Sequence, residues 1–160
     1  MLFRSALGVQ SGDFVATLGL PSVRHVAALL GILRAGACMV PLPSSVAAAA
    51  LEGMIRDSGA KITLAAEDAR NQTALFQGKL SAQVLSIEAM LDDETAASFA
   101  PPAARPEDDF NIIYSSGTTG LPKGIVHGHG MRMRQFKRPD FNFNRDGVML
   151  LATPLYSNTT

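Results

Sequence analysis

The chain has 160 residues, of which 47% are hydrophobic and 18% charged, enough to bury the core of one domain or of two tightly joined lobes. It carries 14 Lys and Arg residues against 14 Asp and Glu residues. This balance gives no overall field that would attract nucleic acid or an anionic membrane, so any anion site must be local.

The chain first predicts a strand, a helix and a second strand. Residues 14–20 are expected to form the first strand, after a Gly-Asp turn. Ser22 is expected to cap a helix whose apolar residues recur at helical spacing until Gly36, a natural stop. Residues 38–42, closed by prolines, predict the second strand.

The next segment repeats this alternation. Ser44 or Ser45 is expected to cap a second long helix, and Gly59 to end it. A strand at residues 61–66, a short helix at 68–75 and a strand at 83–87 are expected to follow. Alternating strands and helices predict a three-layer α/β fold, with a mostly parallel sheet between helices on both sides.

Residues 98–109, rich in proline and acidic residues, break the pattern and predict a surface linker. We therefore expect a first lobe at residues 1–100, incomplete at its N-terminus, a linker at 101–109, and the start of a second lobe at 110–160. The second lobe is expected to hold strands at residues 110–114, 124–127 and 148–153, and a helix at 131–138.

Residues 114–124 form a loop of hydroxyls, glycines and one lysine between two apolar strands. Glycines let backbone N–H groups converge on the closely spaced oxygens of a polyphosphate, hydroxyls add donors, and lysine adds positive charge. The candidate phosphate ligands are Ser115, Ser116, Gly117, Thr118, Thr119, Gly120 and Lys123. A run of this composition is also typical of a flexible linker, but the flanking strands favour a structured loop.

The loop is not the P-loop of nucleoside triphosphatases, which requires glycine before its lysine and a hydroxyl residue after it. Here Pro122 precedes Lys123, and Gly124 follows it. A helix would not easily start at this lysine, because Pro122 fixes its own backbone.

The stretch Tyr-Ser-Ser-Gly-Thr-Thr-Gly-Leu-Pro-Lys-Gly at residues 114–124 resembles the phosphate-loop signature of the adenylate-forming enzymes. These comprise the AMP-forming acyl-CoA synthetases, the adenylation domains of peptide synthetases, and firefly luciferase. Further segments of similar sequence lie at residues 7–13, 33–37, 57–61, 126–130 and 153–157, so the resemblance covers almost the whole chain. The Ser-Ser-Gly start and the His-Gly-His-Gly tail look more like an acyl-CoA synthetase.

The resemblance implies a two-step reaction. A carboxylate attacks the α-phosphate of ATP, which gives an acyl-adenylate and pyrophosphate; a thiol, usually that of coenzyme A, then takes the acyl group. The loop would hold the β- and γ-phosphates, and Mg²⁺ would offset their charge as they leave. Tyr156 holds a position that the family places beside the acyl substrate, and Ser157 stands where histidine is common.

The resemblance also implies parts that this sequence does not contain. The family carries a Tyr-Gly-x-Thr-Glu segment whose glutamate helps hold Mg²⁺, an aspartate for the ribose hydroxyls, and a lysine in a mobile C-terminal domain. We therefore expect a fragment that is inactive alone, with no catalytic residue of its own and a tendency to form non-native oligomers. The carboxylic acid and the identity of the thiol acceptor stay open.

Other residues predict simpler roles. Cys38 is the only cysteine, which fits a reducing compartment, and the chain shows neither a signal peptide nor an apolar run long enough for a bilayer, so we expect a cytoplasmic protein. His25 is expected at the surface or its boundary. His127 and His129 would share a strand face, but without a third ligand we predict no metal site.

A basic cluster with nearby aromatic residues follows the loop, at Arg132, Arg134, Lys137 and Arg138. It predicts a solvated helix face. A contact with a coenzyme A or nucleotide phosphate is the second interpretation, and binding of single-stranded nucleic acid is the third, which the balanced overall charge disfavours.

Three hypotheses for the chain remain open at this point. It is part of an acid–thiol ligase, a non-catalytic module that binds nucleotide or pyrophosphate, or a remnant that cannot fold alone.

Overall fold

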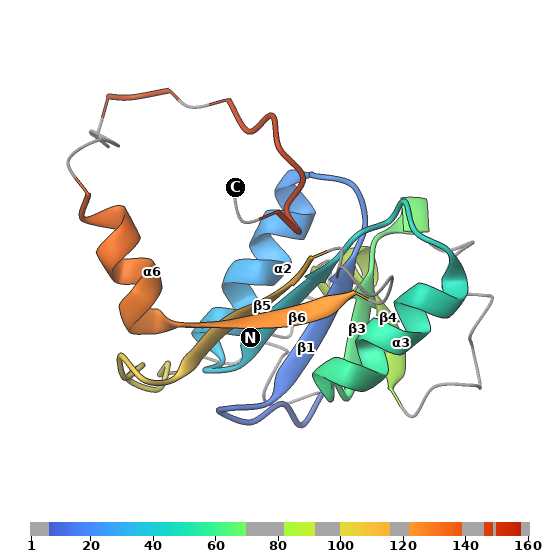
Figure 1. Cartoon of the computed structure of the whole chain (residues 1–160), viewed down its shortest axis with the longest axis horizontal. Helices are drawn as coiled ribbons and strands as arrows, with labels where there is room; N and C mark the ends of the chain where they lie inside the picture. The colour runs from blue at the N-terminus through green and yellow to red at the C-terminus, as the bar shows by residue number, and fades with distance from the viewer. Residues whose placement is uncertain are drawn as a thin grey trace.

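A computed structural model describes residues 7–69, 82–91, 100–115, 122–138, 146–148 and 150–157 of the chain. Its centre is a six-stranded sheet in the order β4-β3-β1-β2-β5-β6 (Figure 1). The strands are β1 (Phe14–Leu18), β2 (Cys38–Leu42), β3 (Ile62–Ala65), β4 (Gln83–Ser86), β5 (Asp109–Ser115) and β6 (Lys123–Gly128).

The sheet is mostly parallel. β1 pairs with β2 and β3, β3 pairs with β4, and β2 pairs with β5, all in parallel. β6 is antiparallel to β5 and forms the end of the sheet. Parallel neighbours require crossover connections, and the helices between the strands provide them.

Helices lie on both faces of this sheet. The crossovers include α2 (Val23–Arg34) and α3 (Ala48–Ser58); α5 (Ile87–Leu91) follows β4, α6 (His129–Phe136) follows β6, and a 3₁₀ turn η1 (Glu67–Ala69) follows β3. Figure 1 shows α2 and α3 on opposite sides of the strands, and α6 beyond the end of β6. The predicted three-layer α/β fold is therefore confirmed.

Side chains that alternate along the strands divide the core into two halves. Ala16 and Leu18 of β1 face α3, in a cluster with Leu51, Met54 and Ile55. The second cluster lies on the side of α2 and α5, and includes Val15, Ala28, Ile32, Leu64, Ile87 and Met90. This alternation is the two-residue period expected of a strand that is covered on both faces.

The helix ends agree with the sequence in two cases and differ in one. As predicted, Ser22 caps α2: its side-chain oxygen accepts a hydrogen bond from the His25 amide at 3.1 Å. Gly59 ends α3, also as predicted, in the left-handed conformation with φ of 68°. The predicted cap at Ser44 or Ser45 is wrong. The N-cap of α3 is Ala47, without a side-chain cap, because a turn separates both serines from the first helical amides.

The predictions for residues 68–75 and 148–153 also need correction. Residues 67–69 form a single 3₁₀ turn rather than an α-helix, and residues 70–75 lie outside the described part. Residues 148 and 150–153 are not in a strand. β5 joins the same sheet as β1–β4, and the division into lobes at residues 1–100 and 110–160 stays a prediction.

Candidate phosphate-binding site

The predicted loop leaves the sheet at the carboxyl ends of its parallel strands. β5 runs parallel to β2, so its last residue, Ser115, lies at the same edge as the ends of β1, β2 and β3. β6 runs back from this edge, starting at Lys123. Ligands of open α/β sheets bind in general outside the carboxyl ends of the strands.

Ser115 and Lys123 are partners in the β5–β6 ladder, so the two ends of the loop lie directly opposite each other. Both residues are exposed. The hairpin thus brings one hydroxyl and one cation together at the start and finish of residues 116–122. The other predicted phosphate ligands, Ser116, Gly117, Thr118, Thr119 and Gly120, lie outside the described residues.

Tyr114 ties this hairpin to α3. Its hydroxyl lies 2.7 Å from Oδ2 of Asp57 and 2.9 Å from the carbonyl oxygen of Met54, and one O–H proton serves these two acceptors. Burial, and then the hydrogen bond to Asp57 and its charge, raise the pKa of Tyr114 well above its usual 10.0. The phenol therefore stays protonated and keeps donating.

A second polar group holds the other end of the hairpin. Oδ1 of Asn111 on β5 accepts from Nδ1 of His127 at 3.0 Å and from Nη2 of Arg132 at 3.2 Å. The guanidinium carbon Cζ of Arg132, on α6, also lies 5.9 Å from the ring centroid of Phe110. Burial, and then the charge of Arg132, lower the pKa of His127, so the neutral ring that donates to Asn111 is favoured.

Sequence reasoning missed these anchors. Asn111 is a polar residue within the apolar run of β5, and only 4% of it is exposed, which is a signal for a buried hydrogen-bonding partner. His127 lies on β6 and His129 begins α6, so the two do not share a strand face as expected. Among the residues that the structure describes, no group of three His, Cys, Asp or Glu side chains is placed to hold a metal ion.

The basic cluster is only partly a solvated face. Arg134 and Lys137 are exposed, but Arg132 is half-buried and bonded to Asn111 and Gln135. Arg132 therefore attaches α6 to the sheet rather than extending a basic surface.

Tyr156 and Ser157 lie in a turn near the end of the described chain. The Ser157 amide donates to the carbonyl oxygen of Pro154 at 3.0 Å, and both side chains are partly exposed. The role of Tyr156 and Ser157 beside an acyl substrate stays a prediction.

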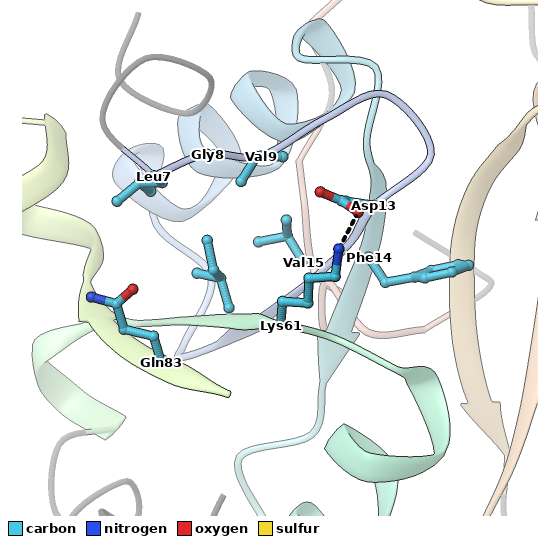
Figure 2. Close-up of a pocket in the computed structure, with 9 residues that line it drawn as sticks. Leu7, Gly8, Val9, Asp13, Phe14, Val15, Lys61 and Gln83 are labelled. Carbon is cyan, nitrogen blue, oxygen red and sulfur yellow. Dashed lines mark hydrogen bonds and ion pairs between the residues drawn. The ribbon is translucent and has the colours of Figure 1, made fainter. Parts of the chain in front are cut away.

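Two hollows lie at the opposite, amino edge of the sheet. One of about 280 Å³ is lined by residues that precede or begin β1, β3 and β4. Figure 2 shows Lys61 reaching across it to Asp13, with their Nζ and Oδ1 atoms 3.0 Å apart. Because Ser115 and Lys123 lie at the carboxyl edge, this hollow is separate from the predicted loop.

The second hollow, of about 460 Å³, lies where the predicted linker meets the turns before β1 and β2. Arg105 pairs with Asp108 here, at 2.8 Å. The Pro106 and Asp108 carbonyls accept the Gly130 and His129 amides, which fixes the start of α6. Pro106 and Asp108 of the predicted linker thus make specific contacts with α6.

Comparisons with known proteins agree with this arrangement. A family model described as AMP-binding enzyme matches residues 1–160. Curated relatives include gramicidin S synthase 2 of Brevibacillus brevis, 37% identical over 76% of this chain and 3% of that protein. Tyrocidine synthase 3 of Brevibacillus parabrevis is 31% identical over 86% of this chain and 2% of its own length.

Solved structures with the same fold include a fatty acyl CoA synthetase of Mycobacterium tuberculosis, with a TM-score of 0.69 and 26% identity over 78% of this chain and 26% of that one. The anthranilate CoA ligase AuaEII, solved with anthranoyl-AMP, also has a TM-score of 0.69, at 28% identity over 77% of this chain and 25% of that one. The chain therefore spans about a quarter of these ligases and a few per cent of the peptide synthetases.

The described part of the chain contains no helix with both the length and the apolar character that crossing a membrane requires.

Proposed function

Since the chain belongs to the AMP-binding enzyme family, the adenylate-forming enzymes, we propose that it serves a ligase that activates a carboxylate with ATP. A carboxylate oxygen bonds to the α-phosphorus of ATP, and the bond from that phosphorus to the bridging oxygen breaks. Acyl-adenylate and pyrophosphate result. Attack by a thiol on the acyl carbon then releases AMP and gives a thioester.

One observation carries this proposal: Ser115 and Lys123 are paired at the carboxyl edge of the sheet, with the hydroxyl- and glycine-rich loop between them. In this role the loop binds and orients the β- and γ-phosphates. Lys123 offers positive charge where negative charge grows as pyrophosphate departs. Mg²⁺ would arrive with ATP and offset phosphate charge, and Ser115 and Lys123 would act beside it.

We propose coenzyme A as the thiol acceptor. The likeness to the fatty acyl CoA synthetase and the anthranilate CoA ligase supports this choice, as does the His-Gly-His-Gly segment at residues 127–130. The similarity to peptide synthetases supports the alternative, an adenylation domain of such a synthetase. Fatty acids, acetate and aromatic acids all remain candidate substrates.

Carboxylate-dependent exchange of labelled pyrophosphate into ATP tests adenylation directly. The complete protein from its source cells is assayed with fatty, aromatic and amino acids, and products are then sought after addition of coenzyme A. Exchange with a non-amino acid followed by a coenzyme A thioester is expected. Exchange with amino acids alone would favour the peptide synthetase alternative, and no exchange with any acid would contradict the proposal.

We also propose that this segment works as part of a longer cytoplasmic chain. Its limited coverage of its relatives supports the longer chain, and its single cysteine, which fits a reducing compartment, supports the cytoplasm. An antibody raised against residues 1–160 is used to find the native protein, and the intact mass of that protein is measured. A product several times heavier than 16.9 kDa is expected. A product of about this mass would instead favour a stand-alone nucleotide- or pyrophosphate-binding module, or a truncated remnant.

A further inference from the structure

Tyr114 belongs to one of the two strands that carry the loop, and its aromatic ring lies against the other. Tyr114 precedes Ser115 on β5, and its partner across the ladder is Gly124, which follows Lys123 on β6. A Cβ atom added at Gly124 would lie 3.2 Å from Cζ of Tyr114 and 3.0 Å from Cγ2 of Ile112. The ring therefore lies against the backbone of Gly124 and occupies the space that a side chain at residue 124 would need.

The hydroxyl of the same side chain reaches a third element. It lies 2.7 Å from Oδ2 of Asp57 and 2.9 Å from the carbonyl oxygen of Met54, both on α3. A hydrogen bond to a carboxylate is stronger than one between neutral groups. The α3 helix packs its apolar face on the sheet through Leu51, Met54 and Ile55, so the hydroxyl is held by a fixed support.

The geometry points to Tyr114 as a positioning residue for the phosphate-binding loop. Tyr114 is part of β5, the strand that enters the loop, and its ring packs against Gly124 of β6, the strand that leaves the loop. Its hydroxyl links both strands to α3 through Asp57 and Met54. This inference rests on the proposed function of the loop and adds residues outside the predicted phosphate ligands. Asp57 supports the loop through Tyr114 and does not itself contact phosphate in this scheme.

Positioning matters here because a phosphate cradle works only if its donors converge before the ligand arrives. An error of about 1 Å in such a site is enough to lose much of its effect. Ser115 is the last residue of β5 and Lys123 the first residue of β6, so loss of the Tyr114 anchor displaces both at once.

The test uses the complete protein with Tyr114→Phe, which keeps the ring, Asp57→Ala, and the double variant. Binding of inorganic pyrophosphate with Mg²⁺ is measured by calorimetry. Amide hydrogen exchange is followed in peptides covering residues 112–126 without ligand. Thr17→Val is the matched control, since it removes a buried hydrogen bond to His25 within the core.

We expect Tyr114→Phe to weaken pyrophosphate binding about fivefold and to speed exchange at the hairpin end, because a charge-assisted hydrogen bond is lost. The double variant is expected to be no worse than Tyr114→Phe, because both changes break one link. Thr17→Val should bind pyrophosphate as the unaltered protein does, despite its lower stability.

Three results would overturn the inference. If Tyr114→Phe bound pyrophosphate normally, the tyrosine would not position the loop, and the proposed function would stand. If Thr17→Val weakened binding equally, the effect would be general destabilisation. If the unaltered protein bound neither pyrophosphate nor ATP, the proposed function and this inference would fail together.

Discussion

His25 shows most clearly how a single residue departs from its expected place. The sequence predicts a position near the surface, yet only 2% of His25 is exposed. Its Nδ1 lies 3.2 Å from the Leu20 carbonyl, which can only accept, so the proton is on Nδ1, and Nε2 accepts from the Thr17 hydroxyl at 2.9 Å. Helical spacing located the helix but not this pair of partners, which come from β1 and the turn after it.

The neutral form of His25 makes folding pH-dependent. Burial lowers its pKa below 6.5, and the Leu20 carbonyl and the charges of Asp68 and Glu88 offset this only in part. The unfolded chain therefore binds more protons than the folded one. The stability that neutral His25 contributes is present above about pH 6.5 and is lost as the pH falls through the pKa of the folded state. We expect urea denaturation to give a lower free energy of unfolding at pH 5.5 than at pH 7.5. His25→Gln should reduce the difference, and an unchanged slope would contradict this assignment.

Cys38 is predicted to be chemically inert in the folded protein. It is fully buried, and burial, with the charge of Asp109, raises its pKa from 9.0 to about 12. At a given pH this leaves about a thousandfold less reactive thiolate. Ellman's reagent should react slowly with the native protein and at once in guanidinium chloride. Rapid reaction under native conditions would show that the β2 core opens readily.

Lys123 is the residue whose removal should affect chemistry more than binding. In the proposed function its charge would face phosphates that become more negative as pyrophosphate leaves, so its effect would be greatest in the transition state. Lys123→Ala in the complete protein should slow adenylation about a hundredfold and weaken ATP binding far less. Lys61→Ala is the control, because Lys61 lies at the opposite edge and pairs with Asp13. Lost ATP affinity with an unchanged chemical step would contradict this role.

At the level of elements, local chemistry predicted most helices and strands of the described chain. Apolar spacing located α2 and α3, and Ser22 and Gly59 marked ends that the structure confirms. The error at Ser44 and Ser45 arose because either serine could cap a helix, but both lie in a turn and α3 begins only at Ala48. Contacts between distant elements, such as Tyr114 with Asp57, leave no local signal in the sequence.

The turn between α2 and β2 depends on Gly36, which has a φ of 80°. A Cβ there would lie 2.5 Å from Cγ of Pro102 and 2.8 Å from Oγ of Ser11. Gly36→Ala should therefore lower the free energy of unfolding by about 2–4 kcal/mol, through backbone strain and overlap with the packed linker.

Gly53→Ala is the matched control for this substitution. Gly53 lies within α3, and nothing stands within 4 Å of the added Cβ. This change should stabilise the chain by about 0.5–1 kcal/mol. Equal effects of the two substitutions in denaturation experiments would contradict the assigned contact between Gly36 and Pro102.

For the whole molecule, the alternation of strands and helices predicted the three layers, but not the order of the strands. β5 lies beside β2, although β3 and β4 come between them in the chain. That placement depends on parallel pairing across long connections. The contacts of Asn111 with His127 and Arg132, which join β5 to β6 and α6, likewise form only in the folded state. The loop could be identified in the sequence because its residues are contiguous, whereas its anchors could not because they are distant from one another along the chain.

The exposed edge at β6 leads us to predict that residues 1–160, expressed alone, associate with one another. β6 is an edge strand within the described sheet, with Ile125 43% and Val126 51% exposed. Such an edge favours pairing with another copy, and a charged side chain opposes it. We expect sedimentation velocity to show oligomers that Val126→Lys reduces. Val23→Lys, at a position 87% exposed on α2, should not reduce them, and a concentration-independent monomer would contradict the prediction.

The hairpin that carries the loop also sets an order for folding. β5 and β6 are joined by residues 116–122 alone, and a hairpin closes on a scale of about 1–10 μs. The parallel pairs must wait for their longer crossovers, because non-local contacts form slowly. The Tyr114–Asp57 contact spans 57 residues, so it can form only after α3 has docked. The loop's two ends can therefore meet early, while its anchoring is among the later events. If the loop has the proposed function, pyrophosphate binding would report completion of the native state.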